Sequence, residues 1–129
     1  KKKSKFPLHG KGLSKRNYIF SDDFCEGIYR IIVKGAAGST YHFSDKNLYS
    51  VRDIINKVCK LMKVNPKKIL SIKKDRIGKD NIYKLRSGKT EKDLSWKSKV
   101  KIDDGIKKMI DYIENNYKHL KKESINFKI

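Results

Sequence analysis

The sequence is poor in the residues that build metal sites, disulfides and membrane spans. It has 2 cysteines and 3 histidines, with no C-x-x-C, H-x-x-H or H-E-x-x-H spacing, so we expect no metal site. No apolar run approaches the roughly 20 residues needed to cross a bilayer. No apolar stretch follows the lysine-rich N-terminus, as it would in a signal peptide. We therefore expect a cytoplasmic protein that does not bind membranes.

The two cysteines fit this setting. Cys25 and Cys59 each fall inside a predicted helix, at a position that would face a core. Free cysteines in such positions usually act as small buried hydrophobic residues in a reducing compartment. We therefore expect both thiols to be buried and unpaired.

Arginine is scarce, although the formal net charge is +19. Only 5 of the 33 basic residues are arginine, and lysines occur from residue 1 to residue 128. Proteins that read nucleic acids favour the planar arginine fork, clustered on one face. The composition favours a lysine-covered surface, so nucleic acid is not the expected partner. A small basic module that binds nucleic acid through phosphate charge alone is the alternative, and it predicts duplex binding that collapses as salt rises.

Strands and helices alternate along the 129 residues, which is typical of an α/β protein or of one lobe of a larger one. Strand candidates lie at 6–9, 17–20, 40–43, 69–72 and 82–85, and helix candidates at 23–34, 50–62, 87–94 and 103–118. We expect one lobe over residues 1–118 and a basic tail over 119–129 that frays. The 37% hydrophobic content allows a modest core.

Two helix starts have the spacing of a capping box. Asp23 with Glu26 would begin one helix, which Gly35 would end. Ser50 with Asp53 would begin the other. The apolar positions of this second helix form one face, at Val51, Ile54, Ile55, Val58 and Met62.

Four ordered segments resemble motifs of one enzyme family. They are Pro7-Leu8-His9-Gly10-Lys11-Gly12 with Arg16-Asn17-Tyr18-Ile19-Phe20-Ser21-Asp22-Asp23; Gly38-Ser39-Thr40-Tyr41-His42-Phe43-Ser44; Asp75-Arg76-Ile77-Gly78-Lys79-Asp80-Asn81-Ile82-Tyr83; and Lys89-Thr90-Glu91-Lys92-Asp93-Leu94-Ser95-Trp96-Lys97. In order, they resemble P-[IL]-[YH]-G-x-G with R-[DN]-[YW]-[IL], then G-x-x-Y-[NH]-[IL]-[GS], D-R-x-G-[HK]-D-x-x-Y and K-x-x-x-x-L-G-W. The third is the most specific.

Together these motifs resemble the C-terminal part of nucleotide-sugar epimerases and dehydratases, which are extended short-chain dehydrogenase/reductases. The 4,6-dehydratases that act on dTDP-glucose are the most similar group. The resemblance implies the substrate-binding lobe of that α/β fold, with the NAD-binding Rossmann half and the catalytic groups outside this sequence. It also implies an NAD-dependent parent enzyme, a lyase or isomerase that is homodimeric and acts on a dTDP- or other NDP-hexose. The chain alone would bind no cofactor and be inactive.

The resemblance also assigns candidate site residues by motif position. Arg16 and Arg76 would contact the diphosphate, which suits a guanidinium fork that stays charged. Lys79 would lie near the diphosphate and Asp80 near the ribose. The base would lie against Pro7, Leu8 and His9, and His42 would contact the substrate where the family more often has Asn. Each of these residues could instead be an ordinary surface or packing residue.

Several features depart from the family pattern. The departures are His42, Ser44, Ile77 and Ser95, and they leave the base and sugar open. The pair Tyr117 and Lys121 has the spacing of the family's catalytic Tyr-x-x-x-Lys. It lies where the last predicted helix has nearly ended, whereas the family's pair precedes this lobe, so we interpret it as coincidence. No G-x-x-G-x-x-G follows a strand. We predict Trp96 to be a packing residue. A third hypothesis for the whole lobe is a structural remnant that binds no ligand.

Overall fold

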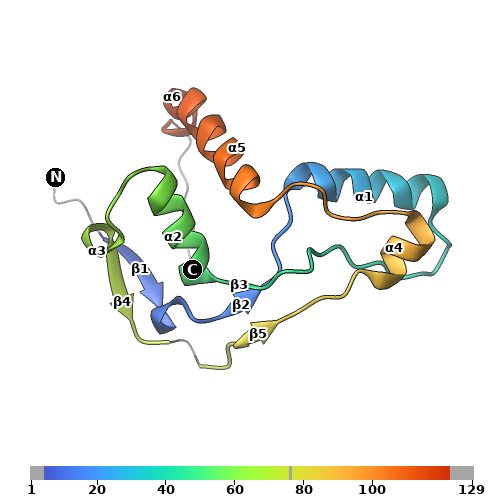
Figure 1. Ribbon diagram of the computed structural model, residues 1–129, viewed down its shortest axis with the longest axis horizontal. Coiled ribbons are helices and arrows are strands. Elements are labelled where there is room, and N and C mark those ends of the chain that lie inside the picture. Colours follow the sequence, from blue (N-terminus) through green and yellow to red (C-terminus); the bar gives the residue numbers. More distant parts are fainter. Residues whose placement is uncertain (1–4, 76, 123–129) are drawn as a thin grey trace.

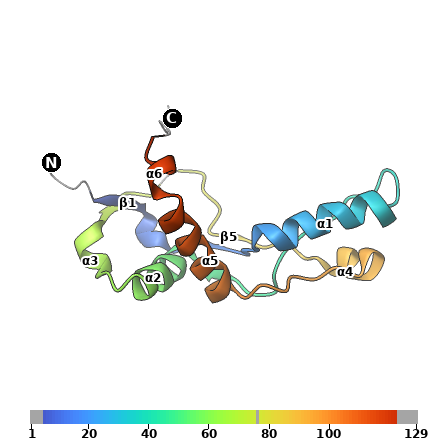
Figure 2. The same cartoon turned by 90° about the horizontal axis from the view of Figure 1, so that it is seen from above.

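Two groups of elements lie at opposite ends of an elongated molecule, joined by a short central sheet (Figure 1). The computed structural model describes residues 5–75 and 77–122. One end holds β1 (Phe6–His9), β4 (Leu70–Lys73), α2 (Val51–Leu61) and α3 (Pro66–Ile69). The other end holds α1 (Ser21–Lys34) and α4 (Gly88–Leu94), and the view from above shows the same separation (Figure 2).

Short strand pairs connect segments that are far apart in the sequence. β1 runs parallel to β4, with Phe6 opposite Leu70 and His9 opposite Lys73. In the centre, β2 (Lys15–Arg16) pairs antiparallel with β3 (Tyr49–Ser50) and parallel with β5 (Ile82–Tyr83). The short helix η1 (Gly10–Gly12) joins β1 to β2. These pairings bring the first and third sequence motifs side by side.

The capping box predicted at Ser50 is confirmed. The Ser50 hydroxyl accepts a hydrogen bond from Asp53 N at 3.0 Å, and Asp53 Oδ2 accepts one from Ser50 N at 2.9 Å. Hydrogen bonds from the Ser50 side chain and backbone lower the pKa of Asp53. The box satisfies two of the amide groups that a helix start leaves without partners.

Replacing Ser50 with alanine should lower the free energy of unfolding by about 1 kcal/mol, because the Asp53 amide loses its acceptor. Urea denaturation followed by far-UV circular dichroism measures this change. Ser98→Ala is the control, since the Ser98 hydroxyl makes only a longer bond of 3.3 Å to Asp23. Equal stability of the wild type and Ser50→Ala would show that the box contributes nothing.

Helix α5 (Ile102–Asn115) packs beside α2, and α6 (Tyr117–Leu120) follows it. Lys57 donates to both carboxylate oxygens of Asp103, at 2.8 and 3.1 Å, which joins α2 to the first turn of α5. This hydrogen bond raises the pKa of Lys57.

The helix predicted over 103–118 is broken at Asn116, whose φ and ψ of −107° and 10° are not helical.

The best-buried side chains lie where α1 meets α4. Leu94 and Trp96 are almost fully buried, and the Trp96 ring packs edge-on against Phe43 with centroids 4.8 Å apart. Trp96 Nε1 donates to Asp23 O at 2.8 Å. The prediction that Trp96 is a packing residue is therefore confirmed.

Four predictions about local structure are wrong. Residues 17–20 and 40–43 form no strand, since no described segment pairs with them in a backbone ladder. Asp23 makes no cap, because its carboxylate bonds the backbone of residues 99 and 100 and α1 begins after Phe20. Cys25 is exposed rather than buried, whereas Cys59 is buried as predicted. Periodicity alone misplaced Cys25, because α1 is covered on one narrow face only.

Over residues 5–75 and 77–122 no helix is long and apolar enough to cross a membrane. In the same part of the chain no three His, Cys, Asp or Glu side chains lie close enough together to hold a metal ion.

Candidate functional site

A pocket of about 590 Å³ lies where β1, β2 and the start of α2 meet the loop after β4. Its wall combines apolar and cationic side chains with glycine backbone. The lining residues are Phe6, Pro7, Leu8, His9, Gly12, Ser14, Arg16, Val51, Ile77, Gly78, Lys79 and Asp80. Six of the eight residues expected from the motifs line it, although 64 residues separate Arg16 from Asp80.

Arg16 supplies the best-placed positive charge of this pocket. It lies on β2 opposite Tyr83 of β5, and its Cζ is 5.8 Å from the centre of the Tyr83 ring. Among the residues described, no carboxylate forms an ion pair with Arg16. The guanidinium donors therefore remain available to an anion in the pocket.

Asn17, the next residue, fixes the strand that carries Arg16. Its Nδ2 donates to Asp45 O at 2.8 Å and to Asn47 O at 3.0 Å. Its Oδ1 accepts from Leu85 N at 3.0 Å. One amide side chain thus joins three chain segments. Apart from the Arg-Asn pair of the motif, nothing in the sequence predicts this role.

Lys79 and Asp80 reach the pocket from the loop after β4. Lys79 Nζ lies 2.6 and 2.5 Å from the two carboxylate oxygens of Asp75, which orders the loop. The Asp75 carboxylate lies directly over Gly10, where a Cβ atom would overlap it. The φ of Gly10, +55°, also favours glycine. Arg76 lies outside the described residues, so its expected contact with the diphosphate stays a prediction.

Strand β1 provides the other wall of the pocket. Leu8 is buried, and Pro7 and His9 are exposed and line the opening. The His9 Nδ1 lies 3.0 Å from Lys74 O, within hydrogen-bonding distance, which ties the end of β1 to the loop that carries Lys79. A flat or apolar group can therefore lie along β1 while an anion lies beside Arg16.

The family model for GDP-mannose 4,6 dehydratase matches residues 1–109, most of the chain. The chain belongs to the GDP-mannose 4,6-dehydratase family. This confirms the resemblance to nucleotide-sugar dehydratases found in the motifs.

Individual members of the family agree with this assignment. A probable dTDP-glucose 4,6-dehydratase of Sinorhizobium fredii is 29% identical over 86% of this chain, and a trifunctional UDP-glucose 4,6-dehydratase of Arabidopsis thaliana is 30% identical over 85%. The solved dTDP-glucose 4,6-dehydratase of Streptomyces venezuelae, with NAD and TYD bound, superimposes with a TM-score of 0.83 at 26% identity over 90% of this chain. The predicted fold class, an α/β lobe of the short-chain dehydrogenase/reductase fold, is confirmed.

The matched region is only one part of these larger proteins. The chain spans 34% of the Sinorhizobium relative, 16% of the Arabidopsis relative and 36% of the Streptomyces structure. The match therefore covers one part of the fold of these proteins.

His42 is the one described candidate that lies apart from the others. It does not line the pocket, and its carbonyl accepts a hydrogen bond of 2.7 Å from Thr90 Oγ1 of α4. The structure thus groups His42 with the α1 and α4 end of this dehydratase-family lobe. Gly12, Ser14 and Val51 line the pocket instead and were missed, because small or apolar residues carry no chemical signal in a sequence.

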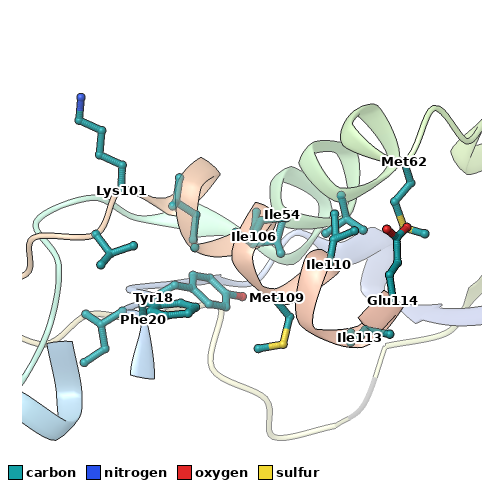
Figure 3. A pocket seen from close by; sticks show the side chains of 15 residues that line it. Tyr18, Phe20, Ile54, Met62, Lys101, Ile106, Met109, Ile110, Ile113 and Glu114 are labelled. Carbon is teal, nitrogen blue, oxygen red and sulfur yellow. The ribbon is translucent and has the colours of Figure 1, made fainter. Parts of the chain in front are cut away.

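A second pocket of about 360 Å³ lies between residues 18–20, α2 and α5 (Figure 3). Apolar side chains such as Ile54, Ile106 and Ile110 dominate it, and Lys101 and Glu114 are its only charged residues. It contains no unpaired arginine, so it suits a diphosphate less well than the first pocket. Tyr18 lines it, and burial raises the pKa of this phenol while the Arg16 charge opposes the rise.

Proposed function

We propose that the pocket beside Arg16 binds the nucleoside diphosphate of a nucleotide sugar, and that this lobe is the substrate-binding part of an NAD-dependent 4,6-dehydratase or epimerase. The observation that carries the proposal is a guanidinium that faces a pocket of about 590 Å³ without a carboxylate partner among the described residues. Arg16 is half-buried, and its N–H donors can make charge-assisted hydrogen bonds to an anion in the pocket. A diphosphate is such an anion.

The rest of the pocket suits the rest of such a ligand. Lys79 also lines the pocket, and although Asp75 accepts from two of its donors, the third N–H can bind a phosphate oxygen. Asp80 can accept hydrogen bonds from ribose hydroxyls, and Pro7 and His9 offer a surface for a base. Relatives named for dTDP-glucose and for UDP-glucose both match this lobe, so the choice of base stays open.

The chemistry in the parent enzyme requires groups beyond this pocket. NAD would accept the hydride from a sugar hydroxyl when bound. Among the described residues, no G-x-x-G-x-x-G turn joins a strand to an α-helix, as a dinucleotide site would need, so in this proposal the lobe binds and orients the sugar nucleotide. The homodimer expected for the parent belongs to the same proposal.

Replacing Arg16 with alanine should weaken nucleoside diphosphate binding by about 1.5 to 3 kcal/mol, or about 10- to 150-fold, because a charge-assisted contact is lost. Isothermal titration with dTDP, UDP, GDP and CDP measures it. Arg86→Ala removes the same charge from an exposed position outside the pocket and should leave binding unchanged. Equal affinities of the Arg16→Ala and Arg86→Ala variants, or no binding of any of the four by the wild type, would contradict the proposal.

A further inference from the structure

We infer that Tyr83 is a positioning residue that holds the Arg16 guanidinium toward the pocket, an inference that rests on the proposed function. The two residues face each other across the parallel β2–β5 pair, and Arg16 Cζ lies 5.8 Å from the centre of the Tyr83 ring. This distance is within the range of a cation–π contact. Tyr83 itself does not line the pocket, so it acts through Arg16.

The register of the two strands is fixed on both sides of this contact. Lys15 N donates to Asn81 O at 2.8 Å, before the pair, and Leu85 N donates to Asn17 Oδ1 at 3.0 Å, after it. A strand held at both ends cannot slide by one residue, so Tyr83 stays opposite Arg16. The ring is therefore a fixed surface against which the long Arg16 side chain can rest.

An aromatic partner has a specific advantage for an arginine that must bind an anion. A carboxylate would orient the guanidinium but would occupy its N–H donors and neutralise its charge. A ring face orients the group while leaving the donors and the charge available. Fewer side-chain conformations then remain to be lost when the ligand binds.

Arg30 of the same chain shows the opposite arrangement. Its Nε and Nη2 donate to Glu26 Oε1, and its Nη1 donates to the carbonyl oxygens of Leu94 and Ser95. These hydrogen bonds join α1 to α4 and leave few Arg30 donors for a ligand. The contrast separates a structural arginine, held by oxygen atoms, from Arg16, held by a ring.

The test compares two substitutions of Tyr83. Tyr83→Leu should weaken binding of dTDP, UDP, GDP or CDP, whichever binds the wild type, by about 2- to 5-fold, the size of an exposed cation–π contact. Tyr83→Phe keeps the ring and should bind as the wild type does. Tyr83 is 48% exposed, so neither change empties a core position. Tyr41→Leu is the matched control, because it removes the contact of Lys89 with a ring at 4.9 Å, outside the pocket.

A double substitution separates positioning from a general structural effect. In the Arg16→Ala background, Tyr83→Leu should cause no further loss of binding, since it acts only through Arg16. A further loss there, or a Tyr83→Leu affinity equal to the wild type, would overturn the inference.

Nuclear magnetic resonance tests the contact without any ligand. The Arg16 Nε–H signal, assigned from its loss in Arg16→Lys, should carry a ring-current shift that Tyr83→Phe keeps and Tyr83→Leu abolishes. An unchanged signal in Tyr83→Leu would overturn the inference even if nucleotides bind. A shift that disappears as expected, in a protein that binds none of the four nucleotides, would support the contact while removing the proposed function.

Discussion

Replacing Trp96 with alanine should lower the free energy of unfolding by about 3 to 5 kcal/mol, the range for a large aromatic residue removed from a core. Trp96 is 2% exposed, packs against Phe43 and donates a hydrogen bond to Asp23 O. Its removal leaves a cavity where α1 meets α4 and an acceptor without its donor. Because it is the only tryptophan, urea denaturation should be followed by far-UV circular dichroism rather than fluorescence.

Two controls make the Trp96 result interpretable. Trp96→Phe keeps a ring against Phe43 but loses the Nε1 donor and some volume, so it should cost less than Trp96→Ala. Ile32→Ala truncates a side chain that is 78% exposed and should change stability by less than about 0.5 kcal/mol. A Trp96→Ala variant as stable as Ile32→Ala would mean that the α1 and α4 end does not depend on this core.

Local signals predicted local structure well. α2 begins at the predicted capping box. The box joins residues only three apart in the sequence, so it forms without contacts from the rest of the chain. α4 likewise falls within the predicted range 87–94. The break between α5 and α6 at Asn116 was not predicted, since the apolar pattern continues through Tyr117.

Strand predictions failed where no described segment pairs with the predicted strand. Residues 17–20 and 40–43 have the β-branched and aromatic character of strands, but a strand exists only when another one pairs with it. In the described structure, Asn17 uses its side chain to join residues 45, 47 and 85, which takes the place of a ladder. The composition of the segment cannot reveal that side-chain hydrogen bonds take the place of backbone pairing.

Most of the candidate site could be predicted from motif order but not from residue chemistry. Arg16, Lys79 and Asp80 meet in one pocket because β1 pairs with β4 and β2 with β5. Their individual surroundings were not predictable. Asp75 forms an ion pair with Lys79, and the Tyr83 ring lies against Arg16. Nothing in the sequence distinguishes Asp75 from the other acidic residues or Tyr83 from the other aromatic residues.

Asp23 shows how tertiary contacts can replace a local prediction. Its spacing to Glu26 suggested a cap, but its Oδ2 accepts hydrogen bonds from Lys99 N at 3.0 Å, Val100 N at 2.9 Å and Ser98 Oγ at 3.3 Å. The side chain of Glu26 instead bonds Arg30 and Lys99, and these contacts lower the pKa of Glu26. Asp23 thus joins the start of α1 to the segment that leads into α5.

Replacing Asp23 with alanine should lower the free energy of unfolding by about 2 to 6 kcal/mol, because two backbone N–H groups lose their acceptor at about 1 to 3 kcal/mol each. Asp23 is 3% exposed, so water does not readily take its place. Chemical denaturation gives the free energy, and hydrogen exchange at the amides of Lys99 and Val100 reports the lost bonds directly. Both amides should exchange faster in the variant.

The neighbouring residue provides the matched control for Asp23. Asp22→Ala removes a carboxylate that is 68% exposed and lies 3.6 Å from Lys108, a surface pair expected to contribute at most about 1 kcal/mol. Asp23→Asn keeps one oxygen that can accept from the two amides and should fall between Asp22→Ala and Asp23→Ala. If Asp23→Ala were no less stable than Asp22→Ala, the backbone around Lys99 would not need this carboxylate. The segment between Trp96 and α5 would then be held by the Trp96 ring and by the ion pair between Lys99 and Glu26.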